Sequence, residues 1–323
     1  MRTPPLGFFL VPFMCTSICT PSPSCYPSCT SSGQILDSPQ VPGRDWWERT
    51  GSLRVIQLEA GCGRATNRLA TLEDGSRVCV RYGVDQDQVL GETLSFHVAT
   101  LLGINNVPPL VLTKPDPSWQ KWSAVRDSIV TLNWSANTIV SLTKWVPNAT
   151  QVSIPIQFRK QLGTGGNSTL ENLTPSELLQ WTDLILFDYL TANFDRVANH
   201  LFNLQWDRLA LDRLTNNLLR TSEGQLVFID NEAGLVHGYR VLDRWEHIHQ
   251  MLLNSTCEYR DQTVQRLTEL NLCRKAAQHL RQVYEAREPF AKELGFLSET
   301  HMLIFQDRVD TLYRHFLKCD NET

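Results

Sequence analysis

The sequence predicts an α+β protein in two lobes, a β-rich N-terminal part followed by a mostly helical C-terminal part. Three observations support this prediction: β-type segments begin near Leu53, a strongly signalled helix begins at Thr174, and the chain is mostly helical after Asp230, as far as Cys319. The chain has 323 residues and a hydrophobic content of 42%. It is therefore long enough to bury a full core in one bilobal unit or in two small domains.

The N-terminal part begins with an expected hairpin of residues 69–72 and 77–82. Asp74 and Gly75 between these segments are a two-residue turn signal. A helix is expected next, over about 87–102, because its valines and leucines recur at helical spacing and a glycine follows its last turn. The early sequence therefore predicts a small sheet followed by one long helix.

Two further strands, 110–113 and 138–145, are expected before the chain becomes helical. Residues 151–171 contain three glycines and a glycosylation sequon, so we expect an exposed loop there. The next helix has Thr174 as its N-cap and extends to about Ala192. A proline directly after the cap and a glutamate three residues after it are strong start signals.

Two acidic residues follow long apolar segments. Asp195 ends LILFDYLTANFDR together with Arg196, and Asp230 ends the strand of QLVFIDNEAGL. Phosphoryl transfer needs one carboxylate near the acceptor hydroxyl and another that holds the metal on the nucleotide phosphates. We therefore interpret Asp195 as the catalytic base and Asp230 as a metal and nucleotide ligand. The alternative is ordinary turn or cap chemistry, with Asp195 merely paired with Arg196.

The order of the elements, with these two acidic residues, is the plan of a protein-kinase-like fold with nucleotide bound between the lobes. The strings FDYLTANFDR and VFIDNEAGLVHGYR resemble the four-jointed box family of secretory-pathway kinases, over roughly residues 53–319. More distantly, FDYLTANFDR is similar to a segment of the Golgi casein kinase, which implies that Asp195 is the catalytic aspartate. By the same resemblance Glu92, within GETLSFHVATLL, is a metal-binding glutamate. The alternative for Glu92 is a surface residue.

Two positions depart from ordinary kinases. Arg81 stands where the V-A-I-K strand carries its lysine. A guanidinium group still binds phosphate oxygens, so Arg81 is a candidate nucleotide ligand. Five residues after Asp195, where ordinary kinases carry an asparagine, this chain has His200, and the neighbouring Asn199 is the candidate.

Other features of the sequence leave more than one interpretation open. Glu232 is either a substrate- or ligand-supporting group or an exposed turn residue. Gly61-Cys62-Gly63 is either a phosphate-covering loop or a turn, because a lone G-x-G is a weak signal. The tryptophans, Trp206 among them, are interpreted as core or interface residues.

Glycosylation and cysteine patterns point to the secretory pathway. Acceptor sequons occur at six asparagines: Asn133, Asn148, Asn167, Asn172, Asn254 and Asn321. The nine cysteines lack zinc-ligand spacing, and disulfides suit an oxidising lumen. We favour Cys257–Cys319 as a clamp on the C-terminal helices, with Cys62–Cys79 also open and Cys273 left over. Free buried thiols are the alternative for either pair.

The N-terminal 42 residues are expected to be a signal or anchor segment followed by a disordered stem. The apolar run from Leu6 to Met14 is too short for a spanning helix, and a Ser-, Pro- and Cys-rich stretch follows it. We assign residues 46–145 to the N-lobe and 146–323 to the C-lobe of one kinase-like domain. The expected location is the Golgi lumen, with the protein either type II anchored or cleaved and secreted.

The net charge of −4, with both signs dispersed, gives no basic footprint for nucleic acid, and membrane contact is expected only through the N-terminal segment. The family resemblance implies a luminal Ser/Thr protein kinase that uses ATP with Mn²⁺ or Mg²⁺. It also implies extracellular cadherin repeats of Fat- and Dachsous-type proteins as partners, with a role in planar cell polarity and growth. The alternative is a pseudokinase that acts as a secreted or Golgi binding partner or ligand. Arg81 and His200 favour the pseudokinase, and the intact Asp195 and Asp230 oppose it.

Overall fold

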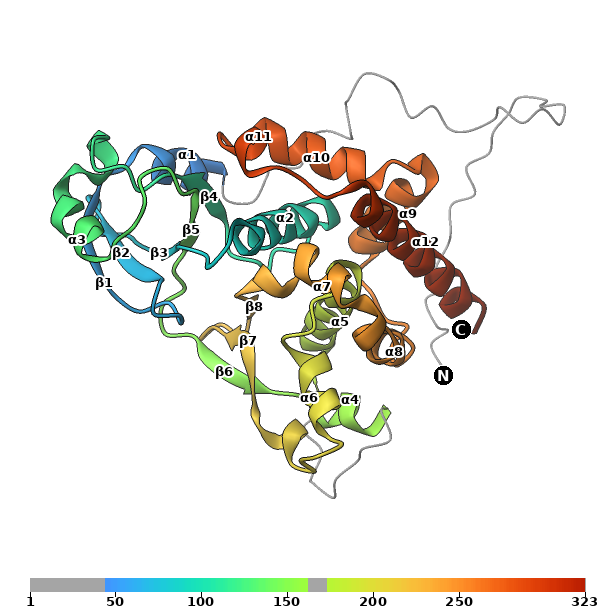
Figure 1. Ribbon diagram of the computed structural model, residues 1–323. Helices are drawn as coiled ribbons and strands as arrows, with labels where there is room; N and C mark the ends of the chain where they lie inside the picture. The colour runs from blue at the N-terminus through green and yellow to red at the C-terminus, as the bar shows by residue number, and fades with distance from the viewer. Residues whose placement is uncertain (1–43, 162–172, 323) are drawn as a thin grey trace, which may run out of the picture. The chain divides into compact units, whose positions relative to one another are not determined.

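The N-lobe is built on a five-stranded antiparallel sheet. The computed structural model describes residues 44–161 and 173–322 (Figure 1). Its first sheet has the strand order β1-β2-β3-β5-β4. The strands are β1 (Val55–Ala60), β2 (Arg68–Leu72), β3 (Arg77–Arg81), β4 (Leu110–Thr113) and β5 (Val140–Lys144). The expected hairpin is confirmed as β2–β3, where Asp74 accepts from the Ser76 backbone and Gly75 has φ 81°.

Short helices that were not predicted cover this sheet. They are α1 (Arg44–Ser52), the 3₁₀ turn η1 (Gln120–Val125) and α3 (Arg126–Thr131). Trp122 and Ile129 from this segment are buried in one cluster with Val80 of the sheet. Lys121 donates to the carbonyl oxygens of Thr50 and Leu53, which satisfies groups at the end of α1. The sheet therefore has a hydrophobic core of its own.

The helix α2 (Gln86–Leu102) joins the two lobes and is buried along most of its length. The Asp85 side chain caps its N-terminus, and Gly103, with φ 73°, ends it. Leu94 of α2 and Leu110 of β4 belong to the same large core as the C-lobe helices. Figure 1 shows α2 beside α10 (Ala276–Arg287). α2 and β4 therefore share one hydrophobic core with the C-lobe helices, while the rest of the sheet keeps its separate core.

The C-lobe centres on α5 (Pro175–Thr191). Thr174 and Glu177 form the expected capping box, in which each side chain bonds the other residue's backbone N–H. Further C-lobe helices follow α5 along the chain, most of them after Asp230, as expected. They are α6 (Val197–Asn203), η2 (Ala210–Asp212), η3 (Asn231–Ala233), α7 (Val236–Arg240), α8 (Leu242–Leu253), α9 (Asp261–Cys273), α10, α11 (Ala291–Leu294) and α12 (Glu299–Glu322). The expectation of a mostly helical C-terminal part is confirmed.

The prediction of an exposed loop over residues 151–171 is wrong for the first half of this segment. This segment forms β6 (Thr150–Ser153) and α4 (Ile156–Gln161), and β6 pairs in a three-stranded sheet with β7 (Leu214–Arg220) and β8 (Leu226–Phe228). Ile154 and Phe158 are buried, so hydrophobic burial outweighs the loop character of the glycine run that follows. The sequons at Asn167 and Asn172 lie outside the described residues, as do residues 1–43.

The structure confirms two disulfides. Cys257–Cys319 joins the segment before α9 to α12 with a Cα–Cα distance of 5.3 Å, and Cys62–Cys79 joins the β1–β2 loop to β3 at 5.7 Å. The interpretation of Cys273 as left over is wrong, because it is also disulfide-bonded.

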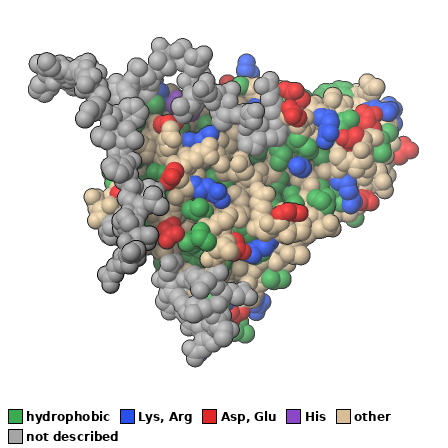
Figure 2. All heavy atoms as spheres, turned by 180° about the vertical axis from the view of Figure 1, so that it is seen from behind, with side chains coloured by type: hydrophobic (Ala, Val, Ile, Leu, Met, Phe, Trp, Pro, Cys, Tyr) green, Lys and Arg blue, Asp and Glu red, His purple; other side chains and the backbone are tan. Residues whose placement is uncertain are grey.

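The surface has two features that agree with expectations from the sequence, namely exposed sequon asparagines and dispersed charges. The sequon asparagines Asn133, Asn148 and Asn254 are exposed, as glycan acceptors must be. Their glycosylation stays a prediction. Figure 2 shows acidic and basic side chains interspersed over the face it displays. Within residues 44–161 and 173–322, no helix is long and apolar enough to cross a membrane.

Candidate active site

Asp195 lies in the turn between α5 and α6, at the junction of the lobes. Ala192 ends α5 in the left-handed region with φ 52°, which turns the chain sharply. The Asn193 side chain then accepts from the Asp195 backbone N–H at 3.0 Å. The sequence TANFD therefore forms a tight turn that presents the Asp195 carboxyl, half-buried, beyond the end of the helix.

Asp230 is held beside Asp195 by a buried arginine. Arg196 is fully buried and donates to both carboxylate oxygens of Asp188 on α5. Its Nη1 donates to the Ile229 carbonyl oxygen and to Asn231 Oδ1, both at 3.0 Å. The residues on either side of Asp230 are thus bonded to the residue after Asp195. Since the Arg196 hydrogen bonds go to Asp188, Asp195 is not simply its partner.

Glu92 is buried on α2 and reaches the same place from the N-lobe side. Its Oε2 accepts from the Asn231 backbone N–H. The approach is close because Gly91 lies against η3, where an added Cβ would stand 2.9 Å from the Glu232 carbonyl oxygen. On the next turn of α2, His97 Nε2 lies 3.3 Å from Glu288 Oε1 in a fully buried pair. The helix that carries Glu92 is therefore fixed at both of these points.

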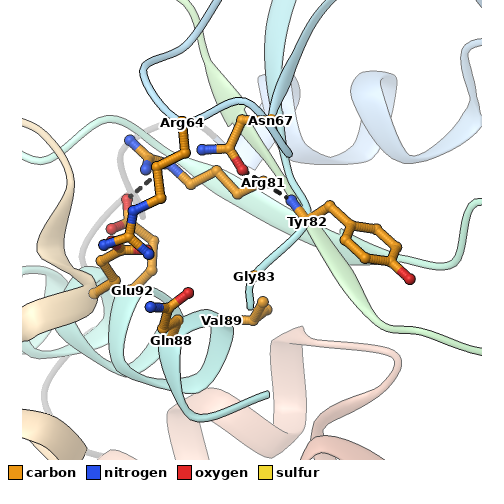
Figure 3. Close-up of a pocket in the computed structure, with 9 residues that line it drawn as sticks. Arg64, Asn67, Arg81, Tyr82, Gly83, Gln88, Val89 and Glu92 are labelled. Carbon is orange, nitrogen blue, oxygen red and sulfur yellow. Dashed lines mark hydrogen bonds and ion pairs between the residues drawn. The ribbon is translucent and has the colours of Figure 1, made fainter. Parts of the chain in front are cut away.

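Arg81 contacts both of the expected metal ligands. Its Nη1 donates to Asp230 Oδ1 at 2.6 Å, and its Nε lies 3.7 Å from Glu92 Oε1. Figure 3 shows Arg81 from β3 and Glu92 from α2 turned into one hollow. Burial by itself lowers the pKa of Arg81, but the charges of Glu92, Asp230 and Glu232 outweigh it and raise that pKa. Arg81 is thus a permanent cation among the carboxylates.

Arg64 is a site residue that the sequence reasoning missed. It follows the Gly61-Cys62-Gly63 turn and forms an ion pair with Glu232. The disulfide from Cys62 anchors this loop to the strand that carries Arg81. The hollow between them is lined by Arg64, Asn67, Arg81, Tyr82, Gly83, Gln88, Val89, Glu92 and Glu232 (Figure 3). A basic residue directly after the G-x-G turn was the available signal.

Asn217 on β7 is a second residue that was missed. Its Nδ2 donates to Asp195 Oδ2 at 2.9 Å and to the Asp195 carbonyl oxygen at 3.3 Å. The backbone at Asn217 has φ 59°, and its carbonyl oxygen accepts from the Ile229 N–H. By contrast Asn199, the candidate from sequence, lies on α6 with its Oδ1 bonded to Asn203. Asn217, not Asn199, orients the carboxyl of Asp195.

The site carries an excess of negative charge. Burial and the charge of Asp230 raise the pKa of Glu232 to about 7. The same two causes raise the pKa of Asp195, and burial raises that of Glu92. With Asp230, four carboxyl groups thus face two guanidinium groups, Arg64 and Arg81.

This donor set fits a divalent cation together with phosphate. Carboxylate oxygens are the ligands that hard divalent cations prefer, and Asp230 and Glu92 converge from opposite lobes. Guanidinium groups bind phosphate oxygens, and Arg64 and Arg81 line the same hollow. Asp195 stands beyond this group and remains available to a hydroxyl group. The arrangement is suited to placing a nucleotide phosphate next to a base.

Comparison with solved structures assigns a protein-kinase-like fold, as expected from the sequence. The crystal structure of the Golgi casein kinase with Mn/ADP bound is similar with a TM-score of 0.55, at 11% identity, over 86% of this chain and 76% of that one. The chain belongs to the four-jointed box family, since residues 43–322 match the model of the four-jointed box protein middle domain. The family resemblance of its motifs is thereby confirmed.

Two relatives show the extent of the match. Four-jointed box protein 1 of Xiphophorus maculatus is 50% identical over 280 residues, which is 85% of this chain and 65% of the relative. The extracellular serine/threonine protein kinase four-jointed of Drosophila melanogaster is 33% identical over 330 residues, 84% of this chain and 56% of the relative. The chain thus spans less than two thirds of the length of these relatives.

Proposed function

We propose that this protein is a luminal Ser/Thr protein kinase that uses ATP with Mn²⁺ or Mg²⁺. The observation that carries the proposal is the convergence of Asp195, Asp230 and Glu92 around two arginines at the junction of the lobes. The Drosophila relative is named as an extracellular serine/threonine kinase, and the structurally similar Golgi casein kinase was crystallised with Mn/ADP. Both support the same reaction class for this chain.

Each residue has a definite role in the proposed reaction. Asp230 and Glu92 would hold the divalent cation, which neutralises phosphate charge when bound. Arg81 and Arg64 bind phosphate oxygens and orient the phosphoryl group. Asp195, with one carboxylate oxygen fixed by Asn217, accepts the proton of the acceptor hydroxyl through the other.

The raised pKa of Asp195 has a consequence for its role as base. A base acts in its ionised form, so its activity is lost as the pH falls through its pKa. Burial raises that pKa, the nearby Asp230 raises it further, and the Asn217 hydrogen bond opposes both. A cation held by Asp230 would cancel part of the raising charge. Asp195 would therefore ionise more readily when that cation is bound.

The proposed acceptors are Ser or Thr residues in extracellular cadherin repeats of the Fat and Dachsous type, with a role in planar polarity and growth. This part of the proposal rests on the family to which the chain belongs. The proposed location is the Golgi lumen, with the protein anchored or released. The disulfides Cys257–Cys319 and Cys62–Cys79 support an oxidising compartment.

The second candidate is a pseudokinase. The observation that favours it is the contact of Arg81 with both Asp230 and Glu92, because a cation must compete with a guanidinium for the same carboxylates. A pseudokinase of this kind keeps the fold and binds partners without turnover. Transfer of phosphate decides between the two candidates.

The test is transfer of labelled phosphate from ATP to a secreted cadherin-repeat fragment in the presence of Mn²⁺. Asp230→Asn is compared with Asp243→Asn, which removes an exposed carboxylate on α8. We expect Asp230→Asn to lower the rate by about a hundredfold or more, and Asp243→Asn to leave it unchanged. Absence of label with folded wild-type protein, over several repeats, supports the pseudokinase.

A further inference from the structure

A second hollow lies on the C-lobe between α6, the helix that follows Asp195 in the chain, and the start of β7. Its volume is about 420 Å³. We call it the α6–β7 hollow. Its walls include Asn199, Asn203, Trp206, Arg213, Leu214 and Asn216. Neither the proposed metal ligands nor the two phosphate-binding arginines take part in it.

Large apolar side chains are exposed around this hollow. Trp206 is 70% exposed, Leu209 61% and Leu214 54%, all within one short segment. Of the two interpretations of Trp206 from the sequence, core or interface, the core is therefore wrong and the interface stays a prediction. Exposing apolar surface to water is unfavourable, and apolar side chains grouped on a surface mark sites that a partner covers.

Trp206 is exposed but firmly supported. Its ring packs edge-on against Phe202 at 5.1 Å between centroids, and Phe202 packs on Trp245 at 4.8 Å. Trp245 in turn stacks on Phe194 at 5.0 Å. A series of aromatic rings thus runs from the neighbour of Asp195 to the rim of the hollow. A rigid aromatic side chain loses little conformational freedom on binding, which suits it as an anchor.

Both walls of the hollow belong to segments that come close to the proposed base. The seven-residue helix α6 begins two residues after Asp195, and its far end carries Asn203. At about 1.5 Å per residue the helix is about 10 Å long, a distance that an extended peptide covers in about three residues. On the opposite wall, Asn216 precedes Asn217, which donates to Asp195. One extended chain can therefore reach both the base and the hollow.

The charges in the hollow favour a neutral segment. Asp207 and Arg213 pair at 2.6 Å, so neither sign is in excess. The amides of Asn199, Asn203 and Asn216 offer donors and acceptors that suit a peptide backbone. An anionic membrane or a free phosphate group would need unpaired cations, which the Asp207–Arg213 pair does not supply. A volume of about 420 Å³ accommodates one large side chain with the adjoining backbone.

We propose that the α6–β7 hollow docks the acceptor polypeptide of the kinase. It takes an apolar or aromatic side chain on Trp206, about three to five residues from the acceptor Ser or Thr. The inference rests on the proposed function and adds a specificity determinant to it. A second copy of this chain is the other occupant that the test distinguishes.

The experiment uses a peptide library with one fixed Ser or Thr and all other positions varied in turn. Phosphorylation by the wild type is compared with Trp206→Ala and with the matched control Leu303→Ala, a residue that is 73% exposed on α12. We expect an apolar preference at one offset in the wild type and in Leu303→Ala, and its loss in Trp206→Ala. For the best peptide, KM rises about tenfold in Trp206→Ala while kcat and the KM for ATP stay unchanged.

Three results overturn the inference. If the wild type phosphorylates the library but Trp206→Ala keeps the same preference and KM, docking at the hollow is wrong and the proposed kinase function stands. Dimerisation of the wild type that Trp206→Ala abolishes, with KM unchanged, assigns the hollow to a second copy. If neither the library nor cadherin repeats are phosphorylated, the proposed function fails and the inference fails with it.

Discussion

Two arginines at the junction of the lobes differ in the balance of charge around them. Arg196 pairs with one carboxylate, whereas Arg81 faces several. Arg196 is fully buried, and its hydrogen bonds to Asp188, the Ile229 carbonyl oxygen and Asn231 use all three of its nitrogen atoms. Arg81 is nearly as buried, but its Nε has no hydrogen-bond partner and it faces several carboxyl groups at once.

This difference distinguishes a residue that holds the structure together, Arg196, from a residue that faces the proposed ligand site, Arg81. The Arg196–Asp188 pair is neutral and buried, and each nitrogen of Arg196 has a partner, so the pair fixes the loops on both sides. Around Arg81 the carboxyl groups outnumber the guanidinium groups, and the pKa of Glu232 is raised to about 7. Such an excess of negative charge is relieved by a cation. The comparison therefore predicts that variants of the first region affect folding and variants of the second affect ligand binding.

The largest effect on stability is expected for Arg196→Met. Removal of this arginine leaves the Asp188 carboxylate buried without its partner, which costs about 3–5 kcal/mol of unfolding free energy. Urea denaturation measures the change. Arg240→Met, which breaks an exposed pair with Asp87, is the control and should cost less than about 1 kcal/mol. Equal losses in the two variants would contradict the distinction drawn between the regions.

A second effect on stability is expected for Gly91→Ala. The new Cβ would stand 2.9 Å from the Glu232 carbonyl oxygen and 3.0 Å from that of Gly234, so α2 must move away from η3. Overpacking of this kind costs about 1–3 kcal/mol, measured by thermal unfolding. Gly51→Ala is the matched control, because nothing lies within 4 Å of the added Cβ. A Gly91→Ala protein as stable as Gly51→Ala would show that the contact is not tight.

A loss of Mn²⁺ affinity with little change in stability is expected for Glu92→Gln. Burial already raises the pKa of Glu92, so the neutral amide is tolerated and stability should change by less than about 1 kcal/mol. Affinity for Mn²⁺ should fall at least about tenfold, because one carboxylate ligand is lost. Calorimetric titration with Mn²⁺ measures this affinity. A large loss of stability with unchanged Mn²⁺ affinity would place Glu92 in the supporting network instead.

The smallest expected effect is the dependence of stability and of Mn²⁺ affinity on pH that Glu232 confers. Its pKa is raised from 4.5 to about 7 in the folded state, so its contribution to stability is present below about pH 4.5 and is lost as the pH rises through about 7. Mn²⁺ binding should have the opposite trend and weaken as the pH falls below about 7, because a cation held by Asp230 and Glu92 favours the ionised form of the neighbouring Glu232 and its binding is linked to release of that proton.

Titration in buffers of different ionisation enthalpy measures the proton released on Mn²⁺ binding. We expect a release near pH 7 in the wild type and a smaller one in Glu232→Gln. Identical proton release in both proteins would exclude Glu232 as the titrating group.

The long motifs allowed much of the site to be predicted. Asp195, Asp230 and Glu92 each lie at the end or on the face of an element whose apolar pattern is clear, and the structure brings them together. Cys257–Cys319 was also expected and is present. The apolar pattern of the surrounding elements and the family resemblance of the motifs indicated the three acidic residues, and the cysteine content indicated the disulfide.

The missed features depend on contacts between distant segments. Asn217 reaches Asp195 from 22 residues away, through a left-handed backbone that no neighbouring glycine signals. Arg64 meets Glu232 across the lobes. Ile154 directly follows β6, and Phe158 lies in α4, next to the glycine run. Both side chains are buried in the core, which favours regular structure in this segment. The intrinsic helix and strand preferences of single residues carry no information about such contacts between distant segments.

The most direct test of the account is calorimetric titration of ADP into the wild type and into Asp230→Asn, with and without Mn²⁺. Asp243→Asn serves as the control for loss of a carboxylate. We predict that ADP binds the wild type and Asp243→Asn only with Mn²⁺, and that Asp230→Asn loses this binding while staying folded. Binding of ADP to Asp230→Asn with wild-type affinity, or with no dependence on Mn²⁺, would contradict the assignment of this cluster as a metal–nucleotide site.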